Sequence, residues 1–116
     1  MYKKIVFIGL ISMLTACSHQ NPLKSSDQKT TAKFLVSASQ YAEQKLGIFT
    51  PPGGYVYGEC MGGKEKTATC QKLYQKMLEF AKTKPAYQNL SLADLTDKKT
   101  WNLLKDDYNQ ERFNTI

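Results

Sequence analysis

Three cysteines are the side chains of this 116-residue chain that are best suited to covalent chemistry. Cys60 and Cys70 lie close together in the middle of the chain, while Cys17 follows an apolar stretch near the start. A thiol can form a disulfide, bind a metal as a thiolate, or act as a nucleophile beside a histidine. The residues available as partners therefore decide between these roles.

Histidine is nearly absent, because the single one, His19, lies two residues after Cys17. The rest of the chain offers no imidazole as a general base or a zinc ligand, so we expect no Ser–His or Cys–His nucleophile there. For the acidic residues of the second half, a solvated helix face is a simpler interpretation than an active site. We predict no enzyme activity, no metal and no cofactor. The acidic residues considered are Asp94, Asp97, Asp106, Asp107 and Glu111.

One spacing imitates a nucleotide site. Gly58, Gly63 and Lys64 match the glycines and lysine of a phosphate-binding loop, but Glu65 stands where that motif needs Ser or Thr to hold magnesium. A simpler interpretation is that Gly62 and Gly63 let the chain turn sharply between the two cysteines. We predict no nucleotide partner.

The first sixteen residues have the plan of a secretory signal. Lys3 and Lys4 form a cationic head, residues 5–14 are apolar apart from a glycine and a serine, and small residues lead up to Cys17. A run of ten apolar residues is too short for a transmembrane helix, which needs about twenty. We therefore expect export without a membrane-spanning helix.

The end of this segment, Leu14, Thr15, Ala16 and Cys17, resembles the lipobox of bacterial lipoproteins at every position. The resemblance implies cleavage before Cys17, a diacylglyceryl thioether on its sulfur and acylation of the new amine. Two or more acyl chains hold a protein durably at a membrane. In enterobacterial lipoproteins an Asp after the cysteine favours the inner membrane, and Ser18 stands there instead. We expect the outer membrane, with the protein facing the periplasm; the alternative is an ordinary thiol after an ordinary signal peptide.

Composition fits one small exported domain. Removing residues 1–16 leaves 100 residues, enough for one domain. Lys3 and Lys4 are removed with them, so the remaining chain has 14 basic and 10 acidic residues. Its net charge is therefore +4, compared with +6 for the whole chain. Nucleic acid is not an expected partner of an exported lipoprotein. In an oxidising compartment Cys60 and Cys70 are expected to form a disulfide. Two free thiols, or bonds to a partner chain, are the alternative.

Three segments follow from these patterns: a signal peptide over 1–16, a lipidated flexible tether over 17–31 and a helical periplasmic domain over 32–116. The tether is predicted because Leu23 is its only large apolar residue. As a coil it would reach roughly 20 Å and hold the domain off the membrane.

Apolar residues at helical spacing predict helices over 32–46, 67–84 and about 97–113. Gly47 is placed to end the first helix and Pro85 the second. The expected fold is all-α, a small three-helix domain with a Pro-, Gly- and Tyr-rich ordered loop that one disulfide holds.

The connections carry weaker signals. Residues 48–63 are expected to form the ordered loop, and residues 86–90 to be extended. Thr30 or Thr31 is placed to cap the first helix, and Thr67 or Thr69 the second. Ser91 precedes a predicted single helical turn over 92–95.

Aromatic residues are the best candidates for partner contact. Tyr55 and Tyr57 flank Val56 beside glycine-rich turns, and together with Phe49 they could form an aromatic surface for a protein partner. Covering the helices is the alternative role for the tyrosines. A set of lysines could touch anionic lipid, although a solvated helix face explains them more simply: Lys64, Lys66, Lys72 and Lys76.

These features together favour a lipid-anchored envelope protein that acts by protein contacts. Lipoproteins with similar signals include accessory subunits of secretion and conjugation systems, notably the small lipoprotein of the type IV secretion outer-membrane core. The alternative is an inhibitor or exclusion lipoprotein that blocks an envelope enzyme or incoming DNA or phage. A cell-wall enzyme is disfavoured by the missing histidine.

Overall fold

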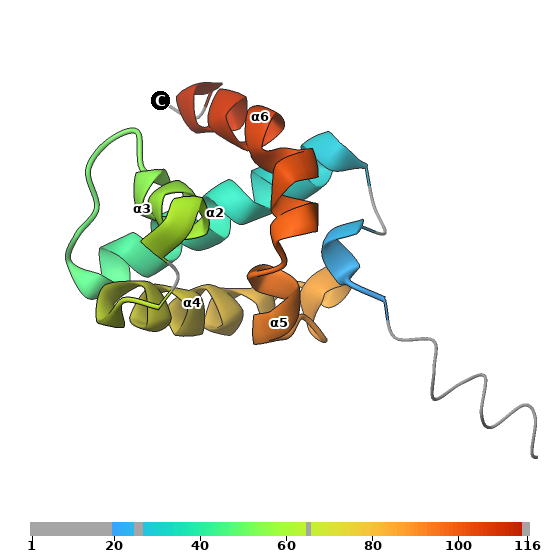
Figure 1. Ribbon diagram of the computed structural model, residues 1–116, viewed down its shortest axis with the longest axis horizontal. Coiled ribbons are helices and arrows are strands. Elements are labelled where there is room, and N and C mark those ends of the chain that lie inside the picture. The colour runs from blue at the N-terminus through green and yellow to red at the C-terminus, as the bar shows by residue number, and fades with distance from the viewer. Residues whose placement is uncertain (1–19, 25–26, 65, 115–116) are drawn as a thin grey trace, which may run out of the picture.

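The structure, a computed structural model, describes residues 20–24, 27–64 and 66–114. Every regular element of this part is a helix or a helical turn, and this part contains no strand. The long helices are α2 (Gln28–Leu46), α4 (Ala68–Ala81) and α6 (Lys98–Asn114) (Figure 1). The predicted all-α class is confirmed.

The predicted signal peptide and its lipobox lie outside the described residues, as do the lipidation site Cys17 and His19. Among the residues that are described, no helix is both long enough and apolar enough to cross a membrane.

Helix α2 is the centre of the fold, because it packs against both α4 and α6 (Figure 1). Each long helix turns an apolar stripe toward the core, as the periodicity predicts. The buried side chains include Leu35, Ala38 and Ala42 on α2, Leu73, Tyr74 and Met77 on α4, and Trp101, Leu104 and Tyr108 on α6.

The start of α2 lies four residues before the predicted one. Asp27, rather than a threonine, caps the helix, since its Oδ2 accepts from the backbone N–H of Thr30 at 3.1 Å. Thr31 is buried, and its hydroxyl donates to the backbone carbonyl of Asp27 at 3.1 Å. The end of α2 is as predicted, with Gly47 in the left-handed conformation at φ 72°.

The prediction of a flexible tether up to residue 31 is wrong for the part that the structure describes. A short 3-10 turn, η1 (Pro22–Lys24), places Leu23 in the core with 3% of its surface exposed. Asn21 Nδ2 donates to the backbone carbonyl of Asp94 at 3.1 Å and to Thr100 Oγ1 at 3.3 Å. The folded part therefore includes Asn21, eleven residues before the predicted boundary at 32.

The predicted ordered loop over 48–63 is helical in its second half. It contains α3 (Tyr55–Glu59) and a π-helical turn, η2 (Cys60–Lys64). These elements are too short to show a helical period in the sequence, so the pattern could not reveal them.

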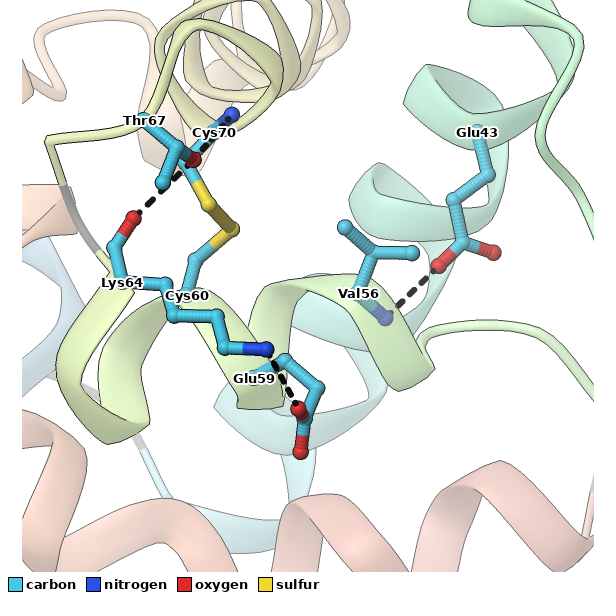
Figure 2. The surroundings of a disulfide bond; sticks show 7 residues. All are labelled: Glu43, Val56, Glu59, Cys60, Lys64, Thr67 and Cys70. Atoms are coloured by element: carbon cyan, nitrogen blue, oxygen red, sulfur yellow. Dashed lines mark hydrogen bonds and ion pairs between the residues drawn. A yellow bond between two sulfur atoms is a disulfide. The ribbon is translucent and has the colours of Figure 1, made fainter.

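The predicted disulfide is confirmed. Cys60 and Cys70 are bonded, with their Cα atoms 5.8 Å apart, and the bond ties η2 to the first turn of α4 (Figure 2). Thr67 caps α4 as predicted, because its hydroxyl oxygen accepts from the backbone N–H of Cys70 at 3.2 Å.

The prediction that residues 86–90 are extended is wrong, because the chain forms a 3-10 turn, η3 (Pro85–Tyr87), which three residues separate from the end of α4. The ring of Tyr87 stacks on that of Phe34, with centroids 3.7 Å apart, and this contact draws the segment back onto α2. The predicted single turn is confirmed as α5 (Leu92–Leu95), which begins with the capping box of Ser91 and Asp94.

Candidate functional site

Tyr57, one of the three predicted contact residues, lies in the core with 1% of its surface exposed. Its hydroxyl donates to the backbone carbonyl of Leu95 at 2.7 Å, and its ring packs edge-on against Trp101 at 5.3 Å. Burial raises the pKa of this phenol well above its usual value, because the charged form would lose its hydration. Its predicted role in a partner surface is therefore wrong.

The helical geometry of α3 explains why Tyr55 and Tyr57 point to different sides and differ in exposure. In extended chain, residues two apart point to the same side, whereas in a helix they point about 200° apart. Tyr55 accordingly has 57% of its surface exposed while Tyr57 is buried. Phe49, the third predicted residue, is half-buried and lies so close to Gly53 that an added Cβ would sit 2.5 Å from its Cε1.

Arg112, near the end of α6, lies close to the rings of both Tyr55 and Phe113. The guanidinium carbon of Arg112 lies 5.6 Å from the centroid of the Tyr55 ring and 5.2 Å from that of the Phe113 ring. Both rings attract the cation through their π faces. Tyr55 is 57% and Phe113 58% exposed, so two exposed rings lie close to one charge. We call Tyr55, Arg112 and Phe113 the contact patch.

A cleft of about 170 Å³ opens beside the contact patch. Trp101 closes part of this cleft, and polar groups from α3 and α6 form the rest of its wall. The lining residues are Tyr55, Gly58, Glu59, Trp101, Asn109 and Arg112.

Helix α6 fixes the chain just before Tyr55 through two hydrogen bonds to backbone carbonyls. Arg112 Nε donates to Gly53 O at 2.8 Å, and Tyr108 Oη donates to Gly54 O at 2.6 Å. Gly54 adopts φ 81°, and a Cβ there would lie 2.8 Å from Tyr108 Oη, so this approach requires glycine. The same arginine thus joins the contact patch and holds its backbone.

Helix α2 holds the other side of this turn. The carboxylate of Glu43, which is 1% exposed, accepts from the backbone N–H of Gly54 at 2.9 Å. It also accepts from the backbone N–H of Val56 at 3.1 Å (Figure 2). Gln40 Nε2 donates to Pro52 O at 2.8 Å. A carboxylate at the N-terminus of a helix satisfies its free N–H groups. We call the four side chains Gln40, Glu43, Tyr108 and Arg112 the clasp.

The phenol of Tyr108 in the clasp stays protonated at neutral pH. Burial raises the pKa of Tyr108, while a hydrogen bond with Ser39, whose Oγ lies 2.8 Å from Tyr108 Oη, opposes part of this shift. Tyr108 therefore remains a hydrogen-bond donor to Gly54 at neutral pH.

Two of the five acidic candidates, Asp94 and Asp97, have local structural partners. Asp94 closes the capping box of α5, and Asp97 accepts from the hydroxyl of Thr100, a bond that lowers the pKa of Asp97. Glu111 is largely buried on α6. In residues 20–24, 27–64 and 66–114, no three His, Cys, Asp or Glu side chains are grouped so that they could hold a metal ion.

The spacing that imitates a phosphate-binding loop has a different structural setting from that motif. Gly58 lies inside α3, and Gly63 turns the chain at φ 132° before α4. Lys64 Nζ lies 3.5 Å from Glu59 Oε1 in an exposed ion pair (Figure 2). Lys76 forms a similar pair with Glu79 at 3.2 Å, while Lys66 and Lys72 are exposed.

No protein-family model, curated protein or solved structure matches this chain. Sequence reasoning missed Glu43, Arg112 and Phe113 as members of this region. One signal was present for Arg112, which is the only arginine among the 16 basic residues. A planar guanidinium can donate in its plane while rings stack on its faces, and lysine cannot do both.

Proposed function

We propose that the protein is an outer-membrane lipoprotein, anchored by lipid on Cys17, that binds another protein of the cell envelope through the contact patch. The lipobox pattern of residues 14–17 supports the anchor. The single observation that supports binding is the pair of exposed rings, Tyr55 and Phe113, that both lie close to the guanidinium of Arg112. Tyrosine and arginine are enriched among the residues that dominate protein–protein binding energies.

The contact patch suits a protein partner because its backbone is already fixed. The clasp holds the turn before Tyr55, and the disulfide holds the chain after α3. A partner would therefore order only side chains on binding, which reduces the entropic cost of association. The cleft beside the patch offers a place for one side chain of that partner.

Catalysis is not part of this proposal. A phenol, a guanidinium and a phenyl ring supply no nucleophile with an adjacent base at neutral pH. The patch does supply apolar area, one positive charge and hydrogen-bonding groups, which are what a protein interface needs.

A photocrosslinking residue at Asn109, which lines the cleft, tests the proposal in intact membranes. We expect one saturable crosslinked species that disappears in the Tyr55→Ser and Phe113→Ser double variant. The matched control carries the same crosslinker at Gln75, an exposed position on α4. The same species from Gln75, or a species unaffected by the double variant, would contradict the proposal.

The identity of the crosslinked protein separates the two kinds of function. A component of a secretion or conjugation system supports an accessory role. An envelope enzyme, or a protein of incoming phage or DNA-transfer apparatus, supports the role of inhibitor or exclusion factor.

A further inference from the structure

The end of the domain where the chain enters the fold carries an uncovered apolar side chain. Leu103, on the first half of α6, has 59% of its surface exposed. It borders a groove of about 290 Å³ between α6 and the turn η1. We call this the entry groove, and its lining residues are Leu23, Lys24, Gln28, Thr100, Leu103 and Leu104.

The entry groove lies beside the point that a lipid anchor would hold. The side chain of Asn21 is hydrogen-bonded to Thr100, which lines the groove, and to the backbone carbonyl of Asp94. Cys17 is four residues before Asn21. Four fully extended residues span at most about 14 Å, and the polar region of one leaflet alone is about 5–8 Å thick. A lipid on Cys17 therefore leaves the groove little room to move away from the bilayer.

We propose that the entry groove rests on the membrane surface, with Leu103 in the interfacial region of the bilayer. This inference rests on the lipid anchor of the proposed function. Two positive charges on the side of Leu103 toward the start of α6 agree with it, because Lys24 lines the groove and Lys99 lies one turn before Leu103 on the same face of α6. An apolar side chain between lysines suits an interface, where the lysine stems lie along apolar surface and their ammonium groups meet anionic headgroups.

The membrane-facing surface has a clear limit along α6. Asp106 and Asp107 come one turn after Leu103, and their negative charge would face the headgroups unfavourably if the surface extended further. The contact patch lies beyond them, since Thr100 and Arg112 are separated by about 18 Å of helix at 1.5 Å per residue. Helix α6 would thus join a membrane-facing end to a partner-facing end.

Two labelled variants of the full lipidated protein test this orientation. Leu103→Cys and Phe113→Cys place one thiol at each end of α6, at positions of nearly equal exposure, 59% and 58%. Because Cys60 and Cys70 are bonded and Cys17 would carry lipid, the added thiol is the one that reacts. Each variant is labelled with a nitrobenzoxadiazole fluorophore and reconstituted into vesicles of phosphatidylethanolamine and phosphatidylglycerol.

We expect the emission of the label at 103 to shift to the blue and to rise severalfold on reconstitution. Lipids with a spin label on the acyl chain should quench it, while the label at 113 should show neither effect. Equal responses at both positions, or no response at 103 in protein that floats with the vesicles, would overturn the orientation and leave the anchor intact. Protein that carries no lipid and does not float would refute the anchor and, with it, this inference.

Discussion

The segments that lie beside the two ends of α6, residues 21–24 and 52–56, are fixed in different ways. At the entry end, one apolar side chain, Leu23, and two hydrogen bonds from Asn21 fix the segment before α2. At the other end, the clasp makes five hydrogen bonds to the backbone of residues 52–56. Shortly after this segment, the disulfide joins Cys60 to Cys70 of α4. Burial of an apolar group is not directional, whereas hydrogen bonds fix position and orientation.

This difference agrees with the two roles that we propose. A surface that rests on a bilayer needs only to be close to it, since lipids adapt to the protein. A patch that binds another protein must hold its rings in one arrangement before binding. Variants that separate core from surface at the contact end, and variants at the entry end, test this difference.

Replacement of Tyr57 by alanine should have the largest effect on stability. The side chain is fully buried between three aromatic rings, and such a truncation costs about 3–5 kcal/mol. The control, Tyr55→Ala, should change the free energy of unfolding by less than about 0.5 kcal/mol, as at most exposed positions. Denaturant unfolding measures both, and similar losses for the two variants would contradict the assignment of core and surface.

Removal of the disulfide should come next. The Cys60→Ser and Cys70→Ser double variant should lose about 2–3 kcal/mol, because the bond closes a loop of about ten residues in the unfolded chain. Urea unfolding of the variant and of the wild type gives this difference. Titration of the oxidised, denatured wild type should find neither thiol, and two reactive thiols would refute the bond.

Truncation of Leu23, the buried side chain of η1, should destabilise the entry end. Leu23→Ala should cost about 2 kcal/mol, at the low end for buried leucine because the start of the chain can relax. Thermal unfolding measures the loss, and Lys24→Ala is the control at the neighbouring exposed position. If Leu23→Ala unfolded at the wild-type temperature, the segment would not be part of the folded core.

Alkaline pH should weaken the contact end selectively. Tyr57 and Tyr108 have raised pKa values in the folded state, so the unfolded state releases their protons first as the pH rises above about 10. The stability that they contribute is complete below that pH and is lost as the pH rises through their folded values. Denaturant unfolding between pH 8 and 11 should show this decline, with a smaller slope in Tyr108→Phe. An equal slope in both proteins would contradict it.

Local signals predicted the parts of the fold that depend on local interactions. The three long helices rest on apolar periodicity along their own segments, and the end of α2 at Gly47 and the caps at Thr67 and Ser91 rest on residues within one turn. The misjudged segments depend on distant partners. Asn21 bonds to Asp94 and Thr100, more than seventy positions later in the sequence, and no pattern near Asn21 shows this.

The candidate site was only partly predictable for the same reason. Tyr55 stays a predicted contact residue, and its neighbours Arg112 and Phe113 lie nearly sixty positions later in the sequence. The helix that separates Tyr55 from Tyr57 begins at backbone N–H groups held by Glu43 of α2. A side chain from another element thus decides which tyrosine faces outward.

The mass of the protein extracted from membranes tests the lipid anchor most directly. The account predicts a chain that begins at Cys17 and ends at Ile116, with the added mass of a diacylglyceryl group and, where the amine is acylated, of one further acyl chain. Alkaline hydrolysis should remove the ester-linked chains and shift the mass accordingly. A chain that retains residues 1–16, or one that begins at Cys17 with no added mass, would contradict the account.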